Sequence, residues 1–152
     1  MPAVQSNYPV TMRPGLAGMI ADMQQRNVRS MVVEGASGLG FGVVAVKGTG
    51  DRQVKASAAA TPFVGITLAD LTAAPGAVAS SPDQYQEKDV AAVMTQGTVW
   101  VVVGAAVAAG EQAYFVPATG VITNVSTANT AIPNAVFMTS AANGALAILH
   151  MR

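Results

Sequence analysis

The sequence predicts an all-β protein, a sandwich or barrel of roughly nine or ten short strands preceded by an extended N-terminal arm. Valine-rich runs of four to eight residues recur between turns made of glycine, proline and asparagine. No stretch of about ten or more residues carries the apolar period of an amphipathic helix. Short strands at this spacing are typical of sandwiches and barrels.

The first 26 residues differ from the rest of the chain. They contain three prolines, a Pro14-Gly15 turn and many amide side chains, without a regular apolar period. We therefore expect residues 1–26 to form an extended arm and residues 27–152 to form the β-domain. The arm and its continuation carry Arg13, Arg26 and Arg29 against one acid, Asp22.

The expected strands follow in order along the chain. Single strands are predicted over Asn27–Val33, Gly40–Val46, Gln53–Ala56, Pro62–Leu68, Gln112–Val116 and Val121–Asn124. Asp89–Met94 and Thr98–Val103 are expected to form a hairpin around Gln96-Gly97, because glycine allows the positive φ of a tight turn. Ala135–Thr139 and Ala145–Met151 should close the chain as a second hairpin around Asn143-Gly144.

A long loop is predicted over residues 69–88. It holds Pro75 and Pro82 and, with its edges, more acids than bases. A loop of this length in a compact domain is usually functional. Its residues Asp83, Tyr85 and Glu87 are candidates for contact with a partner.

The charge composition excludes several classes of function. Only 11% of the residues are charged, and the formal net charge is +0. Nucleic-acid binding is not expected, because it depends on an excess of Lys and Arg. No apolar run is long enough for a membrane helix, and the N-terminus lacks the apolar core of a signal peptide. We expect a soluble intracellular product whose apolar surface is partly covered by other proteins.

No catalytic, cofactor-binding or metal-binding residues are predicted. The chain has no cysteine and one histidine, His150, which lacks an evident catalytic or metal-binding partner. The glycines of Gly35–Gly42 lack the Lys-Ser/Thr of a phosphate loop and a following helix. The acids Asp83, Glu87 and Asp89 are too sparse for a calcium loop. An enzyme is therefore not expected.

Several segments, taken in order, resemble the structural cement (decoration) proteins of tailed bacteriophage capsids. They are RPGLAGMIAD (Arg13–Asp22), GFGVV (Gly40–Val44), PFVGIT (Pro62–Thr67), DVAAV followed by GTVWV (Asp89–Val101), and VAAGEQAY (Val107–Tyr114), with Ile132–Ala135 after them. No segment is specific alone, but their joint order spans residues 13–149.

The resemblance implies a jelly-roll-like β-sandwich on the outer surface of a phage head, clamping neighbouring major capsid subunits without catalysis. The candidate capsid contacts are Arg13, Pro14, Ile20, Asp22, Arg26, Arg29, Asp83, Tyr85 and Glu87. A homodimer is expected, with a homotrimer as the alternative and Ala145–Met151 as the candidate pairing edge. The alternative function is a receptor- or carbohydrate-binding β-domain of a phage tail.

Overall fold

The computed structural model describes residues 13–57, 62–70 and 84–152. These residues form eleven strands and no helix, which confirms the all-β prediction. The strands are β1 (Asn27–Val33), β2 (Leu39–Gly40), β3 (Val44–Lys47), β4 (Gln53–Ala56), β5 (Phe63–Thr67), β6 (Gln84–Tyr85), β7 (Val90–Val102), β8 (Gln112–Phe115), β9 (Ile122–Thr123), β10 (Thr130–Phe137) and β11 (Leu146–Met151).

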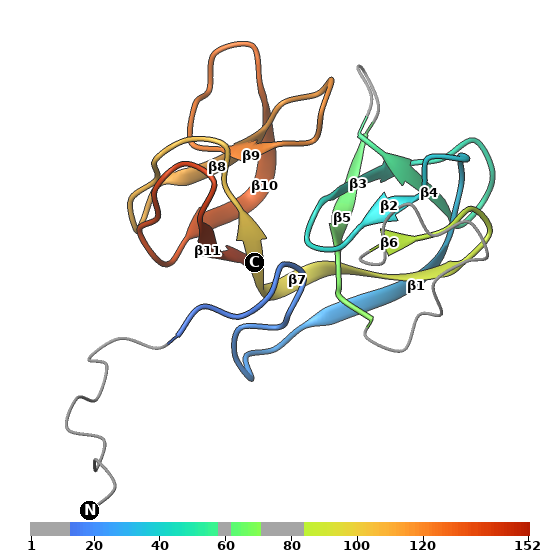
Figure 1. Cartoon of the computed structure of the whole chain (residues 1–152), viewed down its shortest axis with the longest axis horizontal. Helices are drawn as coiled ribbons and strands as arrows, with labels where there is room; N and C mark the ends of the chain where they lie inside the picture. The colour runs from blue at the N-terminus through green and yellow to red at the C-terminus, as the bar shows by residue number, and fades with distance from the viewer. Residues whose placement is uncertain (1–12, 58–61, 71–83) are drawn as a thin grey trace, which may run out of the picture.

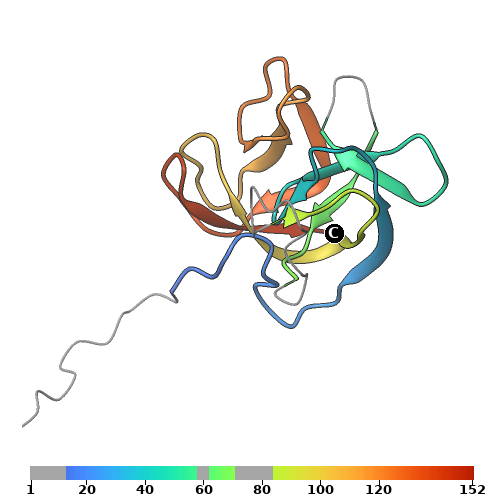
Figure 2. The same cartoon turned by 45° about the vertical axis from the view of Figure 1, so that its right-hand side comes forward.

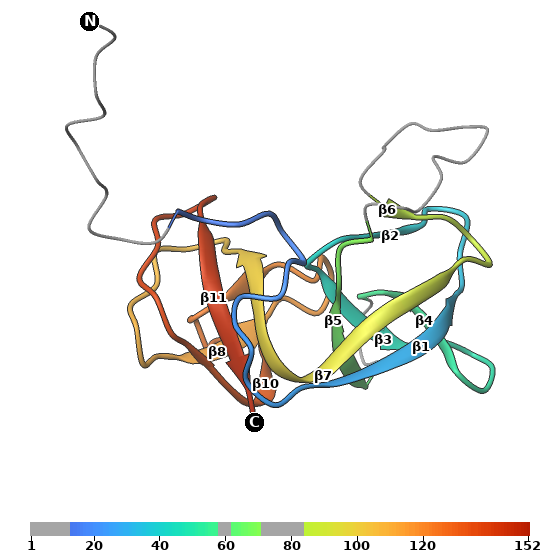
Figure 3. The same cartoon turned by 90° about the horizontal axis from the view of Figure 1, so that it is seen from below.

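Strand β7 connects two barrel-like halves (Figure 1). Nine strands form one sheet in the order β1-β4-β3-β5-β7-β11-β10-β8-β9, and β1 also pairs with β7, which closes the first half into a ring. In the second half, a bridge between Val103 and Ile122 brings β9 back to the end of β7. Figure 3 shows the two halves side by side, with β7 passing from one to the other, and in the view of Figure 2 they partly overlap.

The predicted hairpin around Gln96-Gly97 is wrong, because β7 is one continuous strand of 13 residues. Its first half pairs with β1 and β5, and its second half pairs with β11, whose Met151 lies opposite Gly97. Gly97 has φ +125°, and a Cβ there would lie 2.8 Å from the Cβ of Arg26. Glycine at this position therefore lets β7 change partners without turning back.

Three other boundaries also differ from the sequence prediction. The expected strand Gly40–Val46 is divided into β2 and β3 by a turn at Gly42, whose φ is +66°. The end of the predicted loop 69–88 contains β6, which pairs with β2, while residues 71–83 lie outside the described part. Strand β10 runs from Thr130 to Phe137, whereas the strand was expected over Ala135–Thr139.

The closing hairpin is confirmed, but β11 is not an edge strand. It pairs with β10 on one side and with β7 on the other. Its Ala147 and Leu149 are fully buried in the larger hydrophobic cluster. The prediction that Ala145–Met151 offers an open pairing edge is therefore wrong, because the backbone of β11 already pairs with a strand on each side.

Two hydrophobic clusters stabilise the halves. The larger one fills the second half and extends to Val44, Val46 and Ile66 of the first. The rings of Phe63 and Phe115 meet across the halves, with their centroids 5.9 Å apart. A smaller cluster lies under β2 and β6. The shared larger cluster packs the two halves together.

Candidate functional site

Residues 13–26, called the strap below, run across the outside of β7 and β11 (Figure 3). The backbone of Gly18 donates to Trp100 O at 2.8 Å, Trp100 N donates to Met19 O at 2.8 Å, and Ala21 N donates to Thr98 O at 3.1 Å. Beyond β7, Ala69 N donates to Gly18 O at 2.9 Å. These bonds fix the C-terminal part of the expected arm to the β-domain.

The strap covers Trp100, the only tryptophan of the chain. The indole is 7% exposed, and a Cβ on Gly15 would lie 2.8 Å from its Cδ1 atom. Pro14, Trp100, Met138 and Leu146 line a shallow pocket at this point. Every described aromatic side chain is buried or half-buried.

Asp22 anchors the end of the strap. Its carboxylate accepts a short hydrogen bond from Thr98 Oγ1, and it also accepts from Gln24 N at 3.0 Å and Gln24 Nε2 at 2.9 Å. Partial burial raises the pKa of Asp22, but the hydrogen bonds from Thr98 and Gln24 and the nearby His150 outweigh it. The pKa therefore lies below its ordinary value, so the bonded carboxylate form is favoured.

An unusual number of apolar side chains is exposed along this segment. Ten large hydrophobic residues are exposed among the described residues, and five of them fall within residues 16–28. These five, called the apolar strip below, are Leu16, Met19, Ile20, Met23 and Val28, and Met23 is 88% exposed. Single exposed apolar residues are normal on a protein surface, whereas a group of them marks an interaction site. The apolar strip is therefore a candidate interaction surface.

Arginines flank the apolar strip. Arg13 lies at its start, and Arg26 and Arg29 lie near its end, all with exposed side chains. None of the three forms an ion pair with another described residue, whereas surface arginines in a neutral protein often meet an acid. An apolar strip with arginines near its ends suits a partner that is apolar at its centre and acidic at its rim.

The structure brings six of the nine predicted contact residues together. Arg13, Pro14, Ile20, Asp22, Arg26 and Arg29 lie on the strap or at the start of β1. Glu87 is exposed, but its turn adjoins Val33 at the other end of β1, where Lys88 N donates to Val33 O at 2.9 Å. Asp83 lies outside the described residues.

Tyr85 is a correction to the predicted contacts. Its side chain is 1% exposed, its hydroxyl donates to Leu68 O at 2.8 Å, and its ring meets Phe41 edge-on at 5.2 Å. Burial raises its pKa, while a hydrogen bond from Ala92 N lowers it by less. Tyr85 therefore holds the β2–β6 sheet over the smaller cluster and is not available to a partner.

Sequence reasoning missed Leu16, Met19, Met23 and Val28 as surface residues. A signal was present, because these large apolar residues stand in a segment rich in proline, glycine and amides. Such a segment cannot bury all of its apolar side chains by strand alternation. Only the path of the strap shows which of them remain exposed.

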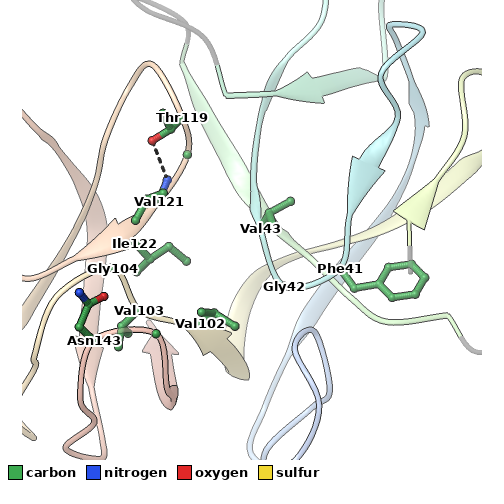
Figure 4. Close-up of a pocket in the computed structure, with 12 residues that line it drawn as sticks. Phe41, Gly42, Val43, Val102, Val103, Gly104, Thr119, Val121, Ile122 and Asn143 are labelled. Carbon is green, nitrogen blue, oxygen red and sulfur yellow. Dashed lines mark hydrogen bonds between the residues drawn. The ribbon is translucent and has the colours of Figure 1, made fainter. Parts of the chain in front are cut away.

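A second surface feature is a groove of about 350 Å³ between the two halves (Figure 4). One side is formed by Phe41–Val43 and the other by Thr119–Ile122, with Val102–Gly104 between them. Its lining residues include no charged side chain. Thr119 and Asn143 are the polar side chains there, so the groove offers contact area but no acid–base group.

Within the described ranges, no three His, Cys, Asp or Glu residues gather as metal ligands. His150 is half-buried in β11 and lies opposite Thr98 in the sheet. The described residues form no helix that is long and apolar enough to cross a membrane.

Comparison with known protein families identifies the family of this chain. The chain matches the family model described as "Structural cement protein (E217 gp24/Pam3 gp6)" over residues 4–152, so it belongs to the structural cement protein family. It is also similar to a solved chain from "The capsid of Myoviridae Phage XM1", with 21% identity, 100% coverage of this chain, 98% of that chain and a TM-score of 0.71. A search of curated proteins found no match.

These findings confirm the resemblance seen in the sequence. The likeness to the phage XM1 chain shows the fold, and membership of the family shows a structural role in the capsid of the virion.

Proposed function

We propose that this protein binds the outer surface of the phage head and clamps neighbouring major capsid subunits, without catalysing a reaction. The observation that carries the proposal is the apolar strip on the strap and the start of β1, flanked by Arg13, Arg26 and Arg29. A fixed strap of exposed apolar side chains pays little ordering entropy on docking, because its backbone is already bonded to β7.

The clamp acts by mass action. A protein that binds only the mature arrangement of capsid subunits stabilises that arrangement by its binding free energy. Repetition of the same contact over the shell multiplies a modest affinity. The arginines at the ends of the strip then govern register and choice of partner more than affinity. The chain is made in the host cytoplasm and joins the head there.

The proposal includes a homodimer as the binding unit, with the trimer as its alternative. A two-fold dimer uses one self-complementary patch and presents two straps to two capsid subunits. With β11 internal, the pairing surface lies elsewhere. We also propose that residues 1–26 form an arm that binds the capsid. No described feature favours the tail-receptor alternative.

The test uses heads that lack this protein and measures co-sedimentation of the purified chain. Met23→Asp places a charge at the most exposed position of the strip and should weaken binding about tenfold or more. Val125→Asp is the matched control, because Val125 is 47% exposed in the loop after β9, away from the strap (Figure 1). Both variants should keep the wild-type unfolding temperature.

Equal loss of binding in both variants, or none in Met23→Asp, would contradict a contact through the strip. A wild-type chain that does not bind the heads at all would contradict the proposal as a whole. Heads with bound wild-type protein should also rupture at a higher temperature than bare heads.

A further inference from the structure

The first residues of β1 have one edge that no described strand covers. Antiparallel β7 pairs with β1 from Asn27 to Val32. On the other side, parallel β4 pairs only with Val32 and Val33. The stretch Asn27–Ser30 is exposed throughout. Half of the backbone groups in this stretch therefore point away from the sheet.

The hydrogen bonds at the end of β1 show which groups these are. Val32 N donates to Arg52 O at 2.9 Å and Glu34 N donates to Val54 O at 2.7 Å, so even-numbered residues direct their amides toward the β4 side. By strand alternation, Val28 and Ser30 direct theirs to the same side. Among the described residues, the N–H groups of Val28 and Ser30 have no partner there, and Ser30 O accepts only Arg52 Nη2, at 3.2 Å.

Three exposed arginines surround this edge. Arg26 precedes it, Arg29 lies within it, and the Arg52 side chain reaches it from the β3–β4 turn, with all three side chains exposed. Asp51, the acid on the same turn as Arg52, forms no ion pair with it. An exposed strand edge with unbonded amides is a template for another strand, and positive side chains select an acidic one.

We infer that the edge of β1 at Val28–Ser30 accepts an extended, acidic segment of the major capsid protein as an added strand. The inference rests on the proposed capsid binding and names where and how one contact is made. Main-chain hydrogen bonds to Val28 and Ser30 supply affinity, and carboxylates of the incoming strand meet Arg29 and Arg52. Val28, the last residue of the apolar strip, lies on the same edge.

A second copy of this chain is a poorer occupant of the edge. Two β1 strands paired about a two-fold axis through the middle of Val28–Ser30 would place Arg29 opposite Arg29. Like charges directly opposite each other destabilise an antiparallel pair.

The experiment compares Val28→Pro with Val28→Thr in binding to heads that lack this protein. Proline removes the outward N–H while leaving the pairing of β1 with β7, because the Val28 amide does not point toward β7. Threonine keeps the N–H and the branched shape. We expect the proline variant to bind at least tenfold more weakly and the threonine variant to bind within twofold of wild type. Arg29→Glu should weaken binding more than Arg29→Gln.

Hydrogen exchange on the wild-type chain provides a readout that needs no substitution. The peptide covering residues 27–31 should exchange more slowly on the head than in free solution. Equal binding by Val28→Pro and Val28→Thr, with unchanged exchange in that peptide while wild type still binds, overturns this inference but leaves the proposed function intact. Protection of the peptide in the free protein, together with a dimer by light scattering, assigns the edge to a second copy and overturns it as well. Failure of wild type to bind the heads overturns both.

Discussion

Gly18 of the strap and Gly42 between β2 and β3 lie backbone against backbone. A Cβ on Gly18 would stand 2.8 Å from Gly42 N, and a Cβ on Gly42 would stand 2.5 Å from Gly18 N. Both residues have positive φ, +81° and +66°. This contact joins the strap to the first half of the molecule, while the bonds to Trp100 join it to β7.

Gly18→Ala should lower the free energy of unfolding by roughly 2–3 kcal/mol, because it adds a steric clash to an unfavourable backbone conformation. Gly144→Ala is the matched control, since Gly144 has φ +78° with nothing within 4 Å of an added Cβ. That control should cost only about 1 kcal/mol, the backbone part alone. Urea unfolding measures both, and equal losses would show that the contact with Gly42 does not matter.

Acid should release the strap through Asp22. Because the folded pKa of Asp22 is lowered, its stabilising contribution is present above the ordinary value of 3.8 and is lost as the pH falls through the folded pKa. Trp100 emission should therefore shift to the red below about pH 4, as the indole loses its cover. In Asp22→Asn this step should disappear. A shift of equal size and midpoint in the variant would assign it to other carboxylates, such as Glu34 or Glu111, whose hydrogen bonds also lower their pKa values.

Tyr85→Phe should cost about 1–3 kcal/mol of stability, because Leu68 O loses its hydrogen-bond donor in a buried place. Tyr114→Phe is the control, since Tyr114 is only half-buried in β8. Thermal unfolding compares the two variants. The folded Tyr85→Phe protein should bind heads as wild type does, and weaker binding without lost stability would restore Tyr85 as a contact.

Truncation separates the two parts of the arm. Removing residues 2–12 should leave Trp100 emission and the unfolding temperature unchanged, because the bonds of Gly18, Met19 and Ala21 to β7 remain. Removing residues 2–22 should shift Trp100 emission to the red and lower the unfolding temperature. If both truncations behave alike, the strap does not cover the indole in solution.

Lysine in β11 should unfold the protein and not merely separate subunits. Ala147 is fully buried, so Ala147→Lys should cost roughly 4 kcal/mol or more, and Ile148→Lys, at 9% exposure, should cost about 2 kcal/mol. Circular dichroism and light scattering measure fold and mass together. A folded variant with half the wild-type mass would show that β11 pairs between subunits. A wild-type monomer in solution and single copies on the particle would contradict the proposed dimer.

The sequence by itself determined the strand content and the family. Strand β1 and strand β4 match their predicted bounds, because each is a short run of strand formers between strong turn residues. The family followed from the order of several motifs, each weak alone. The group of arginines near the N-terminus was also visible, since charge is read directly from the sequence.

Only the tertiary structure decided how the strands are partnered. The sequence at Gln96-Gly97 is compatible with a hairpin turn and with a bend in a long strand, and the choice depends on β1 and β11, which are distant in the chain. For the same reason Tyr85 proved to be core, β11 proved to be internal, and the apolar residues of the strap proved to be exposed. Exposure is set by what packs from elsewhere in the chain, and local pattern carries no information about it.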